Sequence, residues 1–223
     1  MRRGLATRLK KACRWALVIG LCLGYPVVAH FFAASATPSL QGALVAVAPL
    51  AGLALLMAWR SSQRHAMLAL WAAALTVLYV VKGWLVEHYQ WVFFIEHAGT
   101  YSLLCLAFSR TLSSGETPMV SRFAQVVHGD LSPALMRYTR RATWAWSAYF
   151  GAIAGFSVLL FLTAPMHIWS AFANLLGIPL LVLMFSIEYA VRCYVLPAAD
   201  RAGPLEAIRA YRQASTGSTA RMP

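Results

Sequence analysis

Six long apolar runs, separated by polar connectors, constrain the fold of this chain more than any other feature. A helix crosses the apolar core of a bilayer with about 20 mostly apolar residues. The chain has 223 residues, of which 60% are hydrophobic and 12% charged, whereas about a quarter are charged in a soluble domain. The sequence therefore predicts an all-α polytopic membrane protein with a single transmembrane helical domain, 1–223. The expected spans are about 15–34, 43–59, 66–85, 91–108, 143–163 and 168–190.

Basic residues mark one side of the predicted bundle. Eighteen of the 19 Lys and Arg lie in the N-terminal tail, the connectors 60–65 and 109–142, and the C-terminal end. Positive residues stay on the cytoplasmic side of a membrane, and six crossings place all four segments there. We therefore expect a multi-pass protein of the bacterial inner membrane with cytoplasmic N- and C-termini. The first run is longer than a signal-peptide core, so we expect an uncleaved first span.

The net charge of +12 would indicate nucleic acid as the partner of a soluble protein. Here the charges cluster between apolar runs, which indicates anionic lipid headgroups instead. The expected partners are membrane lipids, with envelope or biosynthetic proteins as further candidates, and not nucleic acid.

The cysteines give no sign of a disulfide, a metal or a cofactor. No two of them form a C-x-x-C pair, and none has a His at metal-ligand spacing. We expect them to be small packing residues, so no metal and no cofactor is expected. They are Cys13, Cys22, Cys105 and Cys193.

The cytoplasmic loop 109–142 is expected to contain a short amphipathic helix that lies in the membrane interface. Thr117 would cap this helix, Pro118 would take its first position, and Gly129 would end it. Ser121, Arg122 and Gln125 would form its polar face. Its apolar face would comprise Met119, Val120, Phe123, Val126 and Val127.

A second helix is expected to start at Ser132 and Pro133 and to run directly into the fifth span. It carries three arginines at the headgroup level, where basic side chains also fix topology and anchor the protein. The other interpretation is a site for an anionic headgroup or phosphate, which Arg binds through two parallel hydrogen bonds. The candidate residues of that site are His128, Asp130, Arg137, Arg140 and Arg141.

Few ionisable side chains interrupt the predicted spans, and Glu96 with His97 lies near the start of the fourth. A carboxyl there must stay protonated or find a partner. We expect Lys82 to pair with Glu96 and to join the third and fourth spans; the alternative is a proton or substrate pathway. Glu188 and Arg192 share a helix face, and either stabilise the sixth span or line a polar site open to the cytoplasm.

The fifth span carries a recognisable pattern. An Arg-bearing turn is followed by W-A-W and two aromatics, and a W-x-x-F element precedes the last span. This pattern resembles the septation protein A (YciB) family of bacterial inner-membrane proteins, although Thr143, Ser157 and Ala173 stand where that family is expected to have Asn, Asn and Lys. The matching residues are Arg140, Trp144, Trp146, Tyr149, Phe150, Trp169 and Phe172.

Two further strings, FSRTL and HGDLSPALMRYTRR, resemble uncharacterised membrane proteins encoded in aryl polyene and xanthomonadin-type pigment gene clusters. Some of those proteins carry the label ketosynthase. A ketosynthase needs a Cys nucleophile with His partners in a soluble thiolase-like fold, whereas the cysteines here lie at membrane level. The resemblance therefore implies a part in cell-envelope assembly rather than that chemistry.

The sequence favours a non-catalytic inner-membrane protein that assists assembly of a lipid-like product of the aryl polyene type. One alternative is a small transporter or flippase that uses the Glu96 level. The other is a membrane-embedded transferase that acts at the cytoplasmic face through His128, Asp130 and the arginines. A non-enzymatic role is favoured, and an enzyme is left open.

Overall fold

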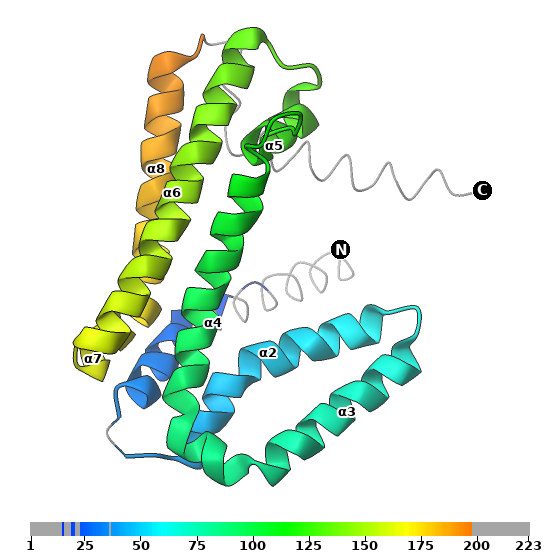
Figure 1. Cartoon of the computed structure of the whole chain (residues 1–223), viewed down its shortest axis with the longest axis vertical. Helices are drawn as coiled ribbons and strands as arrows, with labels where there is room; N and C mark the ends of the chain where they lie inside the picture. Colours follow the sequence, from blue (N-terminus) through cyan, green and yellow to red (C-terminus); the bar gives the residue numbers. More distant parts are fainter. Residues whose placement is uncertain (1–14, 16–18, 21–22, 36, 198–223) are drawn as a thin grey trace, which may run out of the picture. The chain divides into compact units, whose positions relative to one another are not determined.

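The structure is a computed structural model that describes residues 15, 19–20, 23–35 and 37–197 (Figure 1). These residues form helices joined by turns, with no strand among them, which confirms the all-α prediction. An apolar helix, Leu23–Ala33, comes first. The helices that follow it are α2 (Leu40–Arg60), α3 (Arg64–Val80), α4 (Lys82–Arg110), α5 (Met119–His128), α6 (Pro133–Thr163), α7 (Met166–Ser170), the π-helix η1 (Ala171–Leu175) and α8 (Gly177–Val195).

Within this described part, α2, α4, α6 and α8 are long and apolar enough to cross a membrane. The helix Leu23–Ala33 and α3 are apolar but shorter. The expected third span, 66–85, combined most of α3 with the start of α4, but a turn at Val81 separates the two helices. Four candidate spans are thus seen, and the remaining two of the expected six stay a prediction.

The chain forms two compact units, and α4 and α6 both run from one unit into the other. The first contains the described residues up to His97 together with 157–177. In this unit α2 and α3 form a helical hairpin (Figure 1). The indole Nε1 of Trp71 on α3 donates a hydrogen bond to the Ala51 carbonyl on α2 over 3.0 Å, which holds the hairpin together.

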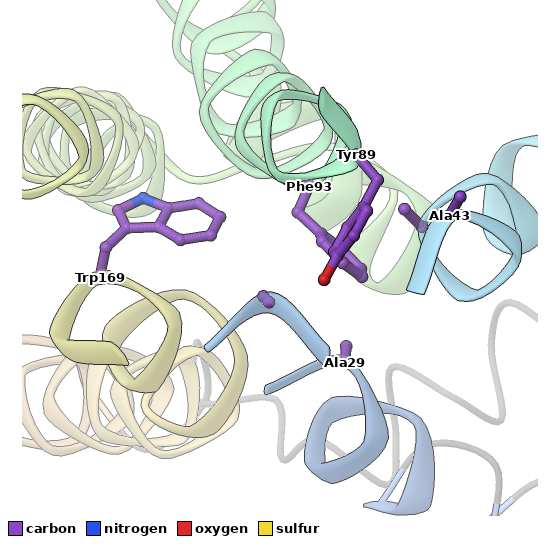
Figure 2. Packing of buried hydrophobic residues seen from close by; sticks show 7 residues of the cluster. Ala29, Ala43, Tyr89, Phe93 and Trp169 are labelled. Carbon is purple, nitrogen blue, oxygen red and sulfur yellow. The ribbon is translucent and has the colours of Figure 1, made fainter. Parts of the chain in front are cut away.

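The core of the first unit pairs small residues with large rings. Figure 2 shows the rings of Tyr89 and Phe93 on α4 reaching toward the small side chains of Ala29 and Ala43. Such small residues let helices approach closely, which is how helices pack in a membrane. Gly42 shows how tight the packing is: a Cβ atom there would lie 2.7 Å from the Tyr89 ring.

Helix α4 is kinked at His88, whose φ of −124° and ψ of 15° are not helical. The His88 Nδ1 atom lies 2.9 Å from the Trp84 carbonyl oxygen, and its ring stacks on Trp84. A side chain that enters the backbone ladder in this way kinks a helix. Just beyond the kink, Tyr89 and Gln90 donate hydrogen bonds to carbonyl groups at the C-terminal end of the helix Leu23–Ala33.

The second unit contains 98–156 and the described residues from Ile178 onward. Helix α6 starts at Pro133, as predicted, and the Ser132 hydroxyl caps it by accepting from the Leu135 amide over 3.1 Å. Its buried side in this unit combines large side chains, such as Trp146 and Phe150, with small and hydroxyl residues that allow close packing. The small and hydroxyl residues include Thr139, Thr143, Ser147 and Ala154.

The expected sixth span, 168–190, is not one helix. The chain forms α7, then the π-helix η1, and α8 begins only at Gly177. In η1 the Leu176 amide bonds to the Ala171 carbonyl, five residues back, over 3.1 Å. A π-helical turn inside an α-helical stretch is rare and is frequent at functional sites. The apolar run did not reveal this break, because η1 contains a single polar residue, Asn174.

Candidate functional site

Two buried serines in the first unit each join distant parts of the chain. The Ser157 hydroxyl on α6 lies 3.0 Å from the His97 Nδ1 atom on α4. The Trp169 indole N–H on α7 donates to the same hydroxyl oxygen, also over 3.0 Å. Because an indole N–H only donates, Ser157 keeps its own hydrogen available for His97. Ser157 and Trp169 are both 0% exposed, so three helices meet at one hydroxyl.

The second serine, Ser170, lies next to Trp169 in sequence and is equally buried. Its hydroxyl lies 3.0 Å from the His30 Nδ1 atom, on the helix Leu23–Ala33. Asn174 in η1 donates to the Ser170 hydroxyl over 3.2 Å and to the Ser170 carbonyl over 3.1 Å. The π-helix therefore places an amide beside the serine that bonds to His30.

Glu96 precedes His97, and its Oε1 atom is buried without a hydrogen-bond partner among the described residues. Tyr25 lies within electrostatic range of this carboxyl and donates its own hydroxyl to the Val45 carbonyl over 3.3 Å. A buried carboxyl oxygen with no donor is costly, and such atoms concentrate at functional sites.

The predicted pair between Lys82 and Glu96 is wrong. Lys82 is the first residue of α4 and Glu96 lies on the same helix, so a pair could not join the third and fourth spans. The Lys82 ammonium instead lies 4.3 Å from the centre of the Tyr79 ring, a cation–π contact. Among the described residues, the carboxylates in ion pairs are Glu116 and Glu188.

The predicted contact between Glu188 and Arg192 on α8 is confirmed. The Arg192 Nη2 atom lies 2.8 Å and 2.9 Å from the two carboxylate oxygens of Glu188, whose side chain is 9% exposed. Tyr138 of α6 donates to the same carboxylate over 2.8 Å. Tyr138 is buried against Leu135, and its hydroxyl joins α6 to α8.

The predicted headgroup site is not assembled by contacts in the part of the chain that the structure describes. Asp130, Arg137 and Arg141 are exposed, and no described hydrogen bond or ion pair connects them. Arg140 donates to the Leu112 carbonyl over 2.9 Å. His128 ends α5, and its side chain lies outside the described atoms. This site therefore stays a prediction.

Helix α5 forms where it was predicted, and Gly129 ends it with a φ of +70°. Its N-terminal end is capped differently from the prediction, because the Thr117 side chain does not cap it. The Thr111 hydroxyl accepts from the Met119 amide over 2.9 Å, and the Thr143 hydroxyl accepts from the Val120 amide over 3.2 Å.

A third bond completes what we call the α5 latch. The hydroxyls of Ser121 on α5 and Thr139 on α6 lie 2.6 Å apart and are both buried. The predicted polar face of α5 thus packs on the protein through Ser121. Phe123 and Val126 of the apolar face are 61% and 46% exposed.

Metal chemistry gains no support from the described residues, since they hold no group of three His, Cys, Asp or Glu side chains that could bind a metal ion. Cys105 and Cys193 are free thiols in the described part. What the first unit offers is a set of hydroxyl, amide, imidazole and indole groups that bond between helices. Sequence reasoning singled out Glu96 and His97 but missed the roles of Ser157, Ser170 and Asn174.

Comparison with known proteins gave no match: no family model fits the chain, and no curated protein or solved structure is significantly similar to it. The geometry therefore defines a class only, a helical protein whose described part contains four helices that could cross a membrane.

Proposed function

We propose that this chain is a multi-pass protein of the bacterial inner membrane that binds and positions a lipid-like product during envelope assembly, without catalysing a reaction. The proposed product is of the aryl polyene type, because the strings FSRTL and HGDLSPALMRYTRR resemble membrane proteins of aryl polyene gene clusters. In this proposal the expected first span, 15–34, and α3 join the four longer helices, which gives six crossings with both termini in the cytoplasm. The α2–α3 hairpin supports α3 as a crossing, because two paired antiparallel helices of similar length share one environment.

The observation that carries the non-catalytic proposal is how the polar groups of the first unit are used. His30, His97 and Trp169 each bond to a serine on another helix. Buried polar groups that bond between helices hold membrane helices in one arrangement. A rigid arrangement of this kind, with large apolar side chains exposed along α2, α6 and α8, suits a protein that holds an apolar molecule in place.

A gene deletion tests this proposal when it is followed by analysis of envelope lipids and pigments. We expect loss or mislocalisation of one lipid-like product, restored by the wild-type chain. Ser157→Leu, which would disrupt the contact among three helices, should fail to restore it. Asp130→Asn should restore it fully. Full activity of Ser157→Leu, or loss of product with Asp130→Asn alone, would count against a scaffold.

Transport of the same product is a second candidate, and one observation favours it: the buried Oε1 atom of Glu96 without a partner. An ionisable side chain inside a span is a functional candidate by default. Glu96→Gln keeps the size of the side chain and removes the charge. If the chain transports, this variant should accumulate product at the inner face while its expression and thermal stability match wild type. Normal export by Glu96→Gln would exclude a transport role for this carboxyl.

A further inference from the structure

The α5 latch leaves an apolar strip on a short helix that no described residue covers. Phe123 and Val126 are three residues apart, so they share one side of α5, and both are exposed. The protein side of the helix is fixed by Ser121 and by the Met119 and Val120 amides. Gln125, also exposed, projects to another side. The strip therefore faces away from the described residues of this unit.

The position of α5 along its neighbours indicates what that is. Thr111 directly follows the end of α4, and Thr143 begins the apolar part of α6. Because both threonines bond to the first amides of α5, this helix starts level with the end of α4 and with the start of the apolar part of α6, which follows the first turns from Pro133. The next residue on α6, Trp144, is 60% exposed, and exposed Trp is typical of the membrane–water interface.

The charge around α5 fits an anionic surface. Segment 110–141 contains five Arg, one Glu and one Asp, hence a net charge of +3 with His128 neutral. Glu116 neutralises Arg122 through an ion pair of 2.7 Å. Arg137 and Arg141 are exposed and bond to no described residue. Exposed cations beside an exposed apolar strip are the pattern of helices that lie on anionic membranes.

We propose that α5 is a preformed docking surface for the anionic cytoplasmic leaflet, with Phe123 and Val126 inserted among the lipids and Arg137 and Arg141 at their phosphates. A free helix of 10 residues is marginal in water and must fold as it binds, since isolated helices need about 12–15 residues. The latch removes that requirement. This inference rests on the proposal that the long helices cross the membrane.

The test uses the full chain with its four cysteines replaced and one nitroxide spin label at a time, reconstituted in vesicles of phosphatidylcholine and phosphatidylglycerol. The labelled variants are Phe123→Cys, Val126→Cys and the matched control Gln125→Cys on the same helix. Collisions with oxygen report lipid and collisions with a nickel chelate report water. We expect the oxygen-to-nickel ratio to be severalfold higher at positions 123 and 126 than at 125. Arg137→Gln with Arg141→Gln, or pure phosphatidylcholine, should lower the ratio at 126.

Three results would overturn the inference. Equal access of nickel to all three positions would show α5 in water, and shielding of 123 and 126 from both reagents would show a protein partner, including a second copy. An oxygen-to-nickel ratio at position 126 that is the same in charged and uncharged vesicles would refute the preference for an anionic surface. A fourth label, Leu183→Cys on α8, separates this failure from that of the proposed function. If oxygen reaches position 183 while the nickel chelate reaches position 123, only the docking surface is refuted. If the nickel chelate reaches both positions, the proposed membrane crossings are refuted as well.

Discussion

At the scale of single residues, the contact of Gly42 with Tyr89 is the most sensitive to added volume. An alanine Cβ at Gly42 would lie 2.7 Å from the Tyr89 ring, and that ring is held by its hydroxyl, which donates to the Phe32 carbonyl over 2.9 Å. Gly42→Ala is therefore expected to lower the free energy of unfolding by about 1–3 kcal/mol, the range for overpacking. Thermal unfolding in detergent measures this.

Gly52 on the same helix is the matched control, because a Cβ atom there meets nothing within 4 Å. Gly52→Ala is expected to leave the melting temperature unchanged or to raise it, since Ala is favoured over Gly within a helix. If both variants melt alike, the close approach at Gly42 is not real.

Ser157 provides a second prediction at this scale. Ser157→Ala removes the shared partner of the His97 ring and the Trp169 indole, and a buried group left without a partner costs about 1–3 kcal/mol. Ser147 on the same helix is also buried but bonds only to the Thr143 carbonyl of its own helix. Ser147→Ala should therefore destabilise the protein clearly less than Ser157→Ala. Denaturant or thermal midpoints compare the two, and equal losses would contradict the role of Ser157.

Residue by residue, the sequence located the unusual side chains but not their partners. Glu96 and His97 stood out because ionisable groups are rare in apolar runs. His97 and Ser157 are 60 residues apart, and His30 and Ser170 are 140 apart, so no local pattern connects them. A serine in an apolar helix is common enough to give no signal by itself. The Lys82 and Glu96 prediction failed because the turn at Val81 placed both residues on α4.

At the scale of elements, the link from α6 to α8 depends on a carboxylate with two partners. Glu188 is nearly buried and bonds to Tyr138 and Arg192. Arg192→Leu leaves that carboxylate without its cation, which is strongly destabilising for a buried pair. Replacing both charges, with Glu188→Leu and Arg192→Leu, is expected to recover at least about 1 kcal/mol relative to Arg192→Leu alone. Equilibrium unfolding of the two variants decides it, and a double variant less stable than the single one would contradict the prediction.

Elements with local signals were predictable from the sequence. Gly129 ends α5 because its positive φ suits glycine, and Ser132 before Pro133 starts α6. The breaks inside apolar runs were not predicted, because Lys82 after Val81 and Asn174 in η1 are single polar residues in runs that are otherwise apolar. The capping of α5 by Thr111 and Thr143 was missed because these residues are distant in sequence or belong to other helices.

At the scale of the whole molecule, the number of crossings decides which side each connector faces. Composition and the distribution of Arg made a helical membrane protein predictable, and the four long helices agree with it. Whether α3 crosses depends on its 17 residues, which span about 25 Å at 1.5 Å per residue, close to the roughly 30 Å of a bilayer core. The crossing by α3 is therefore tested by finding on which side of the membrane the connector between α2 and α3 lies.

Single cysteines in the cysteine-free chain locate the connectors in intact spheroplasts treated with a membrane-impermeant thiol reagent. With six crossings, Thr37→Cys and Ala164→Cys face outward and react, whereas Ser61→Cys and Ser113→Cys react only after permeabilisation. With crossings by α2, α4, α6 and α8 alone, Ser61 and Thr37 exchange sides while Ala164 and Ser113 keep theirs. Ser61 is the decisive position, because basic residues flank it at Arg60 and Arg64 and positive residues stay in the cytoplasm. Reaction of Ser61→Cys in intact spheroplasts would show that α3 does not cross the membrane and would refute the six-crossing topology.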